Sequence, residues 1–188
     1  MTIGDLPEDF ATPAALAATE EGEPDESIIT HSSAAHSPQP TSSWSEAEEF
    51  DAFITGLGLH FFSPSEFLVK GGSNSSGNCA GRNGNPPRDL WPNIAATARV
   101  LDQLRARLGY SVTLTSAYRT PPYNACISGA QFSQHVRFNA ADFQGSSGSP
   151  SQWADALREM RDSNVFRGGI GRYATFIHVD TRGQNADW

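Results

Sequence analysis

The stretch Ser-Gln-His-Val-Arg-Phe-Asn-Ala-Ala-Asp, residues 133–142, places a histidine and an aspartate seven positions apart, at His135 and Asp142. A second histidine, His178, follows in the run Phe-Ile-His-Val-Asp, residues 176–180. Zn²⁺ takes imidazole nitrogen and carboxylate oxygen in a tetrahedral shell, and catalytic zinc sites use three protein ligands and leave a fourth position for water. We therefore interpret His135, Asp142 and His178 as a candidate zinc-binding set. On spacing alone, a surface histidine beside an unrelated aspartate fits the pattern equally well.

The run 176–180 also predicts how His178 is presented. Successive side chains of a β-strand point to opposite faces, so His178 and Asp180 share one face while Ile177 and Val179 share the other. We expect the apolar pair to pack on helices and the polar pair to face a cleft. The alternative is that His178 is an ordinary half-buried histidine.

Two further motifs flank these residues: Ser-Ala-Tyr-Arg-Thr-Pro at 116–121 and Gly-Gly-Ile-Gly-Arg-Tyr at 168–173. Taken in order with the histidine motifs, they resemble the zinc D-alanyl-D-alanine carboxypeptidase family. That family belongs to the superfamily that also holds Hedgehog signalling domains and lysostaphin-like peptidases. The likeness runs from about residue 62 to residue 188. It implies a zinc peptidase that acts on the D-amino-acid stem peptides of bacterial peptidoglycan, either as a carboxypeptidase or as an endopeptidase.

The resemblance also implies roles around the ligands. Arg119 is expected to stabilise the oxyanion of a tetrahedral intermediate or to clamp a substrate carboxylate; a surface salt bridge is the alternative. Tyr118, Ser133 and Gln134 are expected to border the substrate. Ser133 and Gln134 are equally suited to forming a turn or to supporting the ligands by hydrogen bonds.

Two positions depart from the family pattern. Several relatives carry Asp or Glu three residues before the last histidine, where this chain has Thr175, and many have Gly near Phe138. Asp180 is the nearest substitute for the general base that zinc hydrolases need, although it is equally suited to orienting a ligand. The departure keeps two other functions open: a catalytically weak or inactive zinc-containing module that binds cell walls, and a structural piece of a virion or cell wall.

Charge is distributed unevenly along the chain. Residues 1–51 hold 12 Asp and Glu and no Lys or Arg, whereas residues 52–188 hold 13 basic against 9 acidic residues. The composition of residues 1–42 cannot build a core, so we expect a disordered acidic tail and then one peptidase-like domain over residues 43–188. The mildly basic body suits an anionic cell wall, although such a net charge is also ordinary. No basic run is dense enough to predict nucleic-acid binding.

No apolar run is long enough to predict a membrane span, and residues 1–5 do not begin a typical secretory signal. The implied substrate predicts an extracellular, periplasmic or cell-wall location, or a phage-encoded protein, acting as a monomer. Cys79 and Cys126 are too far apart for a zinc motif. We expect a disulfide that pins the polar loop 70–89 beside the cleft, in an oxidising location; two free thiols are the alternative.

Helix and strand signals are mixed along the chain. Apolar residues recur at steps of three and four between Pro92 and Leu108, and Gly109 follows, which predicts a helix and its end. Capping signals at either Ser43 or Ser45, and at Ser149, predict two further helices. Strands are expected at residues 111–116, 140–143, 169–173 and 176–181. This mixture predicts an α+β fold with a small antiparallel sheet packed against helices, as in the Hedgehog and DD-peptidase superfamily.

Overall fold

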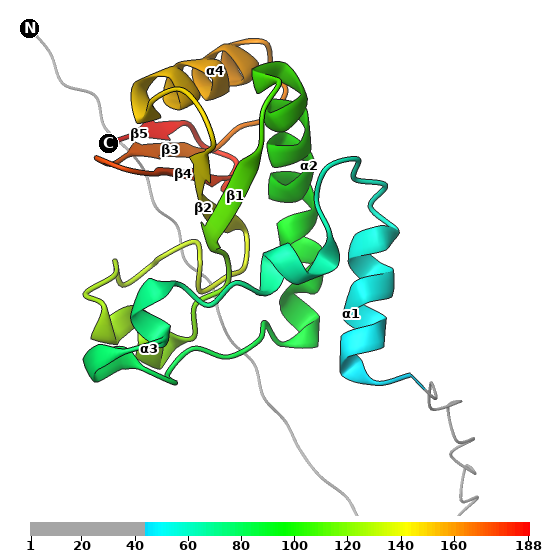
Figure 1. Ribbon diagram of the computed structural model, residues 1–188, viewed down its shortest axis with the longest axis vertical. Helices are drawn as coiled ribbons and strands as arrows, with labels where there is room; N and C mark the ends of the chain where they lie inside the picture. Colours follow the sequence, from blue (N-terminus) through cyan, green and yellow to red (C-terminus); the bar gives the residue numbers. More distant parts are fainter. Residues whose placement is uncertain (1–43) are drawn as a thin grey trace, which may run out of the picture. The chain divides into compact units, whose positions relative to one another are not determined.

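A computed structural model describes residues 44–188 (Figure 1). The expected acidic tail, residues 1–42, therefore lies outside the described residues. The helices are α1 (Glu46–Thr55), α2 (Trp91–Leu108), α3 (Pro121–Cys126) and α4 (Pro150–Asp162). The strands are β1 (Val112–Ser116), β2 (Ala140–Gly145), β3 (Gly169–Arg172), β4 (Ile177–Asp180) and β5 (Ala186–Asp187). Among these residues, no helix is long and apolar enough to cross a membrane.

The helix ends follow the capping signals of the sequence. Ser45 and Glu48 form a reciprocal capping box at the start of α1. The backbone of Gly109 is left-handed, with φ of 74°, and ends α2. Between α1 and α2 the chain forms only short 3-10 turns, at Pro64–Leu68, Gly72–Asn74, Gly77–Cys79 and Arg88–Leu90. The predicted loop 70–89 is thus an irregular segment with local turns.

The described strands form one sheet in the order β1-β2-β4-β3-β5. Pairing is antiparallel except between β3 and β5, which run parallel. The α+β architecture is as predicted, but β5 was not expected. Two residues are too few for a recognisable strand pattern, and the partner of β5 lies far away in the sequence.

One face of the sheet carries the core. Helices α2 and α4 pack on this face, and α1 packs against α2 (Figure 1). The sheet contributes alternate residues to the core, among them Phe143, Ile177 and Val179, all of which are fully buried. Asp142 directly precedes Phe143, and His178 lies between Ile177 and Val179, so both point to the opposite face. The alternation therefore separates the core from the face that carries the polar groups.

Strand β1 has an irregular register that changes the direction of Ser116. Leu114 pairs with Phe143 on the core face, yet Ser116 pairs with Asp142, so β1 has one extra residue at this point. Regular alternation would have placed Ser116 on the same face as Leu114. An extra residue of this kind turns the following side chain to the other face. Ser116 consequently lies beside Asp142, on the polar face.

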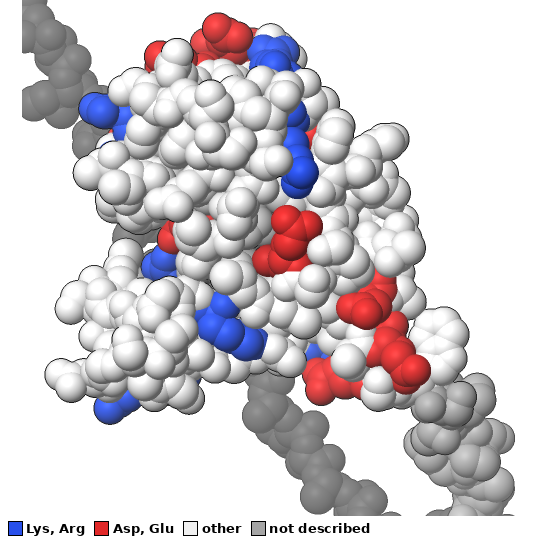
Figure 2. Space-filling model, in the orientation of Figure 1, with Lys and Arg blue, Asp and Glu red and all other residues white. Residues whose placement is uncertain are grey.

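The described residues contain 13 acidic and 13 basic side chains, because all Lys and Arg of the chain lie within them. On the face shown in Figure 2 the charged groups are scattered, and acidic side chains gather near α1. The excess of basic residues predicted for residues 52–188 is therefore offset by the acidic residues of α1. Attraction to an anionic polymer does not arise from the net charge of this part of the chain.

Candidate metal centre

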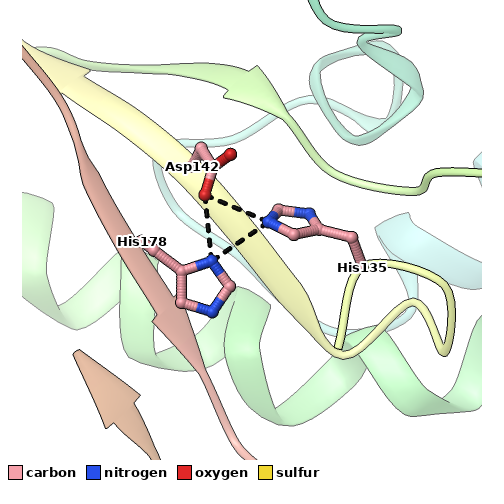
Figure 3. A group of neighbouring side chains, drawn as sticks. All are labelled: His135, Asp142 and His178. Carbon is pink, nitrogen blue, oxygen red and sulfur yellow. Dashed lines mark hydrogen bonds and ion pairs between the residues drawn. The ribbon is translucent and has the colours of Figure 1, made fainter. Parts of the chain in front are cut away.

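Three buried side chains converge on the polar face of the sheet (Figure 3). Asp142 of β2 and His178 of β4 are directly opposite each other in the strand register. His135 reaches them from the segment before β2. Three distances are each 3.0 Å: His135 Nε2 to Asp142 Oδ1, His178 Nδ1 to Asp142 Oδ1, and His135 Nε2 to His178 Nδ1. The structure thus brings together the three residues predicted as ligands.

Hydrogen bonds on the far sides of both rings fix which nitrogen faces the centre. His135 Nδ1 lies 2.6 Å from the carbonyl oxygen of Ala117, to which it donates. His178 Nε2 lies 2.9 Å from Asp180 Oδ2 and donates to it. The remaining nitrogen of each neutral ring then presents a lone pair to Asp142. Three acceptor atoms that face one another repel unless a proton or a metal ion lies between them.

The donor atoms fit a small tetrahedral ion. His135, Asp142 and His178 each offer one ligand atom, and these atoms all lie within 4.8 Å of one another. Ligands at about 2.0–2.1 Å from a tetrahedral Zn²⁺ are separated by roughly 3.3 Å. The observed 3.0 Å spacings are close to this value and need only a small expansion. Two imidazoles and one carboxylate form a donor set typical of zinc.

The electrostatics also favour a cation at this point. Burial raises the pKa of Asp142, but its interactions with His135, His178 and Arg119 outweigh burial and hold that pKa well below its ordinary value. Burial lowers the pKa of His135. Burial also opposes protonation of His178, yet hydrogen bonds to Asp142 and Asp180 raise its pKa overall. A metal ion therefore competes with a proton for Nδ1 of His178.

A cleft of about 580 Å³ opens above these three residues. Figure 2 shows the molecule hollowed at the left, between the sheet and the region of α3. The lining residues come from the segment 127–134, from the loops that follow β1, β3 and β4, from the residue after β5 and from the centre itself. They are Arg119, Ile127, Ser128, Gly129, Ala130, Phe132, Ser133, Gln134, His135, Asp142, Tyr173, Phe176, His178, Arg182 and Trp188. The predicted centre therefore lies at the floor of the cleft.

Comparison with protein-family models matches residues 60–180 to the model described as Peptidase M15. The chain belongs to the M15 peptidase family. No curated protein and no solved structure matches it. M15 metallopeptidases are typically zinc-dependent, in agreement with the donor set of the three converging side chains.

Arg119 is held on the cleft side of this M15 peptidase. Its Nε donates to Ser116 Oγ at 3.0 Å, and its Nη2 donates to Asp142. The irregular register of β1 makes the first contact possible by turning Ser116 towards Asp142. The guanidinium is thus oriented by two partners while it still lines the cleft. It occupies a position from which it can stabilise negative charge on a substrate.

Asp180 lies on the opposite side of His178 and outside the cleft. It is 0% exposed, and besides His178 Nε2 it accepts hydrogen bonds from the backbone of Gly169 and from Arg182. Burial raises its pKa, but the hydrogen bonds from His178, Arg182 and Gly169 outweigh burial and hold the pKa well below its ordinary value. The expected polar face of β4 is therefore split. His178 faces the cleft, whereas Asp180 is enclosed, an arrangement that favours the orienting role over the general-base role.

The structure separates the predicted substrate-binding residues. Ser133 and Gln134 line the cleft. Tyr118 does not: it is 7% exposed and packs edge-on against Phe138, with ring centroids 6.0 Å apart. Thr175 is exposed and does not line the cleft. Asp142 is then the only carboxylate among the lining residues of the described chain.

Phe138 lies in the segment between His135 and β2 and has an unusual backbone conformation. Its backbone is left-handed, with φ of 55°, a conformation that costs a bulky residue on the order of 1–3 kcal/mol. Its ring is fully buried and lies against Tyr118 and Phe50, so packing offsets the strain. Phe138 is thus a buried aromatic anchor beneath the segment that carries His135.

Cys79 and Cys126 are joined by a disulfide, with their Cα atoms 5.8 Å apart. Cys126 is the last residue of α3, and the cleft-lining segment 127–134 begins immediately after it. Asn124 holds the same segment, because its Nδ2 donates to the carbonyl oxygen of Ala130 at 2.9 Å. The loop that contains Cys79 is thus tied to one wall of the cleft.

Proposed function

We propose that this M15 peptidase binds Zn²⁺ through His135, Asp142 and His178 and hydrolyses D-Ala-containing or other stem-peptide bonds of bacterial peptidoglycan. The observation that carries the proposal is the convergence of three acceptor atoms, each 3.0 Å from the others, at the floor of a cleft. A zinc ion there supplies Lewis acidity and, at neutral pH, a nucleophile derived from water.

The protein's own residues then position the substrate. Arg119, already oriented by Ser116 and Asp142, faces the region in which negative charge develops on the carbonyl oxygen. A donor fixed in advance needs no reorganisation during the reaction. Ser133 and Gln134 offer a hydroxyl and an amide to the peptide backbone of the substrate. Asp180 keeps His178 in the tautomer that leaves Nδ1 free for the metal.

The test is to incubate the zinc-loaded protein with purified peptidoglycan and to analyse the products by mass spectrometry. Release of D-Ala assigns a carboxypeptidase, and cleaved stems assign an endopeptidase. His178→Ala is the control, and it should lose both zinc and activity. Intact stems after prolonged incubation with the zinc-loaded wild-type protein would contradict the proposed hydrolysis.

A second function is favoured by one specific observation. Among the described residues, the cleft offers no carboxylate other than Asp142 to accept the proton that hydrolysis releases. A zinc-containing module that binds cell walls without turnover accounts for this absence. Co-sedimentation with peptidoglycan, in parallel with product analysis, separates the two functions, because this module binds and releases nothing.

The disulfide supports the proposed location of the protein outside the cytoplasm. Such bonds rarely persist where thiols are kept reduced. Thiol titration of the denatured, unreduced protein should detect no reactive thiol from Cys79 or Cys126. Two reactive thiols per chain in protein isolated from its source would argue against an extracellular, periplasmic or cell-wall location. Light scattering tests the accompanying expectation of a monomer.

A further inference from the structure

Large aromatic side chains are concentrated at the cleft and have no role in the chemistry proposed above. Phe132, Tyr173 and Trp188 are 75%, 42% and 49% exposed, and all three line the cleft. Exposed aromatic surface gathered at one place on a soluble protein usually marks a binding site. Tyr173 directly follows β3, and Trp188 directly follows β5 at the edge of the sheet.

Tyr173 and Trp188 form one rigid unit, which we call the aromatic platform. Trp188 Nε1 donates to Tyr173 Oη at 3.0 Å. The ring of Tyr173 stacks on Phe176, with centroids 4.3 Å apart and planes 7° from parallel. The backbone of Trp188 is held by bonds to Arg172 and Ile170 of β3. The rings keep much of their surface exposed although they are fixed from behind, and a surface fixed in advance loses little entropy on binding.

The strand beneath Trp188 leaves room for the indole. A Cβ at Gly171 would lie 2.6 Å from indole atoms, and a Cβ at Gly169 would lie 3.0 Å from them. Neither glycine has a positive φ, so the need for glycine here is space rather than backbone conformation. The close fit shows that the position of Trp188 is determined by β3.

The charges beside the platform are already paired. Arg182 lies over the Trp188 ring, 5.3 Å from its centroid, but its guanidinium is bonded to Asp180. Arg119, the other arginine of the cleft, is bonded to Asp142. The polar groups that remain near the platform are neutral, among them the hydroxyl of Ser133 and the amide of Gln134. The part of the cleft around the platform therefore suits an uncharged group with an apolar face and polar edges.

We propose that the aromatic platform binds a pyranose ring of the glycan, so that the substrate is a stem peptide still attached to its sugar. This inference rests on the proposed function and deepens it. A pyranose presents a face of C–H groups that packs on the electron-rich face of an aromatic ring. Its hydroxyl and acetamido groups at the edges match the neutral donors and acceptors of the cleft.

The position of the platform limits which bond is cut. The ring centroids of Trp188 and His178 are 5.2 Å apart. An extended peptide advances about 3.3–3.6 Å per residue, so a sugar on the platform lies within one or two residues of the metal centre. The scissile bond then belongs to the glycan-proximal part of the stem.

The test compares two substrates with the same stem: a muropeptide, in which the stem carries its disaccharide, and the free peptide. The wild-type protein should cleave the muropeptide with a kcat/KM at least about tenfold higher, mainly through a lower KM, and mass spectrometry should locate the cut near the glycan. In Tyr173→Ala this ratio should fall towards one, whereas Tyr173→Phe, which keeps the stack on Phe176, should retain most of it. Trp44→Phe, at an exposed aromatic that does not line the cleft, should leave the ratio unchanged.

A binding measurement separates this inference from the proposed function. The disaccharide without peptide is titrated into the wild-type protein and into Trp188→Ala, with binding followed by NMR. Saturable binding that Trp188→Ala loses supports the platform even if no stem is cleaved. Equal cleavage of both substrates, cleavage only at the terminal D-Ala, or absence of disaccharide binding would each overturn the inference and leave the proposed hydrolysis intact.

Discussion

Asp142 and Asp180 are alike in residue type, burial and neighbouring residues, but different kinds of hydrogen-bonding group surround their carboxylate oxygens. Each lies on the polar face of the sheet, each pairs with an arginine, and each contacts His178. Asp142 Oδ1 faces Nδ1 of His178 and Nε2 of His135, both of which present lone pairs. The oxygens of Asp180 instead receive N–H groups from His178, Gly169 and Arg182.

This difference separates a ligand from a support. An oxygen that is surrounded by donors is satisfied and needs no ion, whereas an oxygen that is surrounded by acceptors needs a cation or a proton. Burial and charge do not distinguish the two carboxylates, because both are almost fully buried and both have a lowered pKa for the same kinds of reason. The hydrogen-bond partners of each oxygen do distinguish them.

The strongest test of the comparison is Asp142→Asn. Structural zinc sites in small domains bind the metal with a free energy of about 10–16 kcal/mol, to which four ligands contribute. The loss of one ligand should therefore weaken zinc binding by about a hundredfold to a thousandfold. Isothermal titration or competition with a chelator measures the affinity. Asp155→Asn, at a side chain that is 66% exposed, is the matched control. Unchanged zinc affinity in Asp142→Asn would remove Asp142 from the ligand set.

The arginine partner of Asp142 extends the comparison to activity. Arg119→Lys keeps the charge but loses the planar guanidinium, so kcat/KM should fall by about a hundredfold, as for other oriented donors. Arg172→Lys, at an exposed arginine outside the cleft, should change kcat/KM little. Steady-state kinetics on a stem peptide measure both. If Arg119→Lys kept the wild-type kcat/KM, Arg119 would only hold Asp142 in place and would not stabilise charge on the substrate.

Asp180→Asn should have a smaller effect on the metal than Asp142→Asn. Loss of a partner that orients a ligand typically weakens metal binding by about 10–100-fold. We expect a value near tenfold, because Arg182 and Gly169 still hold the side chain at position 180. The zinc affinity and the pH profile of kcat should be measured together. A loss of turnover at unchanged zinc affinity would instead assign the general-base role to Asp180.

Asp187 provides a third Asp–Arg pairing, at the surface. Burial raises its pKa, but Arg161 and Arg158 outweigh burial and lower the pKa overall. A lowered pKa stabilises the fold above the ordinary value of about 3.9, and this contribution is lost as the pH falls through the folded-state pKa. Because the side chain is 41% exposed, Asp187→Asn should cost less than about 1 kcal/mol at pH 7. Urea unfolding at pH 7 and pH 3 should show that difference shrinking in acid; a constant difference would contradict the electrostatic cause.

The sequence was informative where spacing alone determines the structure. The apolar spacing between Pro92 and Leu108 predicted α2, and Gly109 ends that helix in the left-handed conformation that glycine favours. Strand alternation placed His178 on the face opposite Ile177 and Val179, and the structure agrees. These features depend on neighbours in sequence, so no tertiary knowledge was needed.

Other features depend on contacts between distant segments. Alternation assigned Asp180 to a face, but only the positions of Gly169 and Arg182 reveal that this part of the face is covered. The irregular register that turns Ser116 towards Arg119 has no signal in the run 111–116. Tyr118 was expected to border the substrate, yet its ring packs in the core. Local sequence patterns predict to which face of a strand or helix a side chain points, but not which distant segment packs against that face.

The pairing of β5 with β3 has a consequence for hydrogen exchange. β5 has two residues and lies at the edge of the sheet, whereas β2 and β4, which carry Asp142 and His178, are paired on both sides. Local opening requires the least free energy where few hydrogen bonds must break. The amides of β5 and Trp188 should therefore exchange with deuterium well before those of β2 and β4. Trp188, although ordered in the closed sheet, would belong to the first part of the sheet to open transiently, and the metal centre to the last.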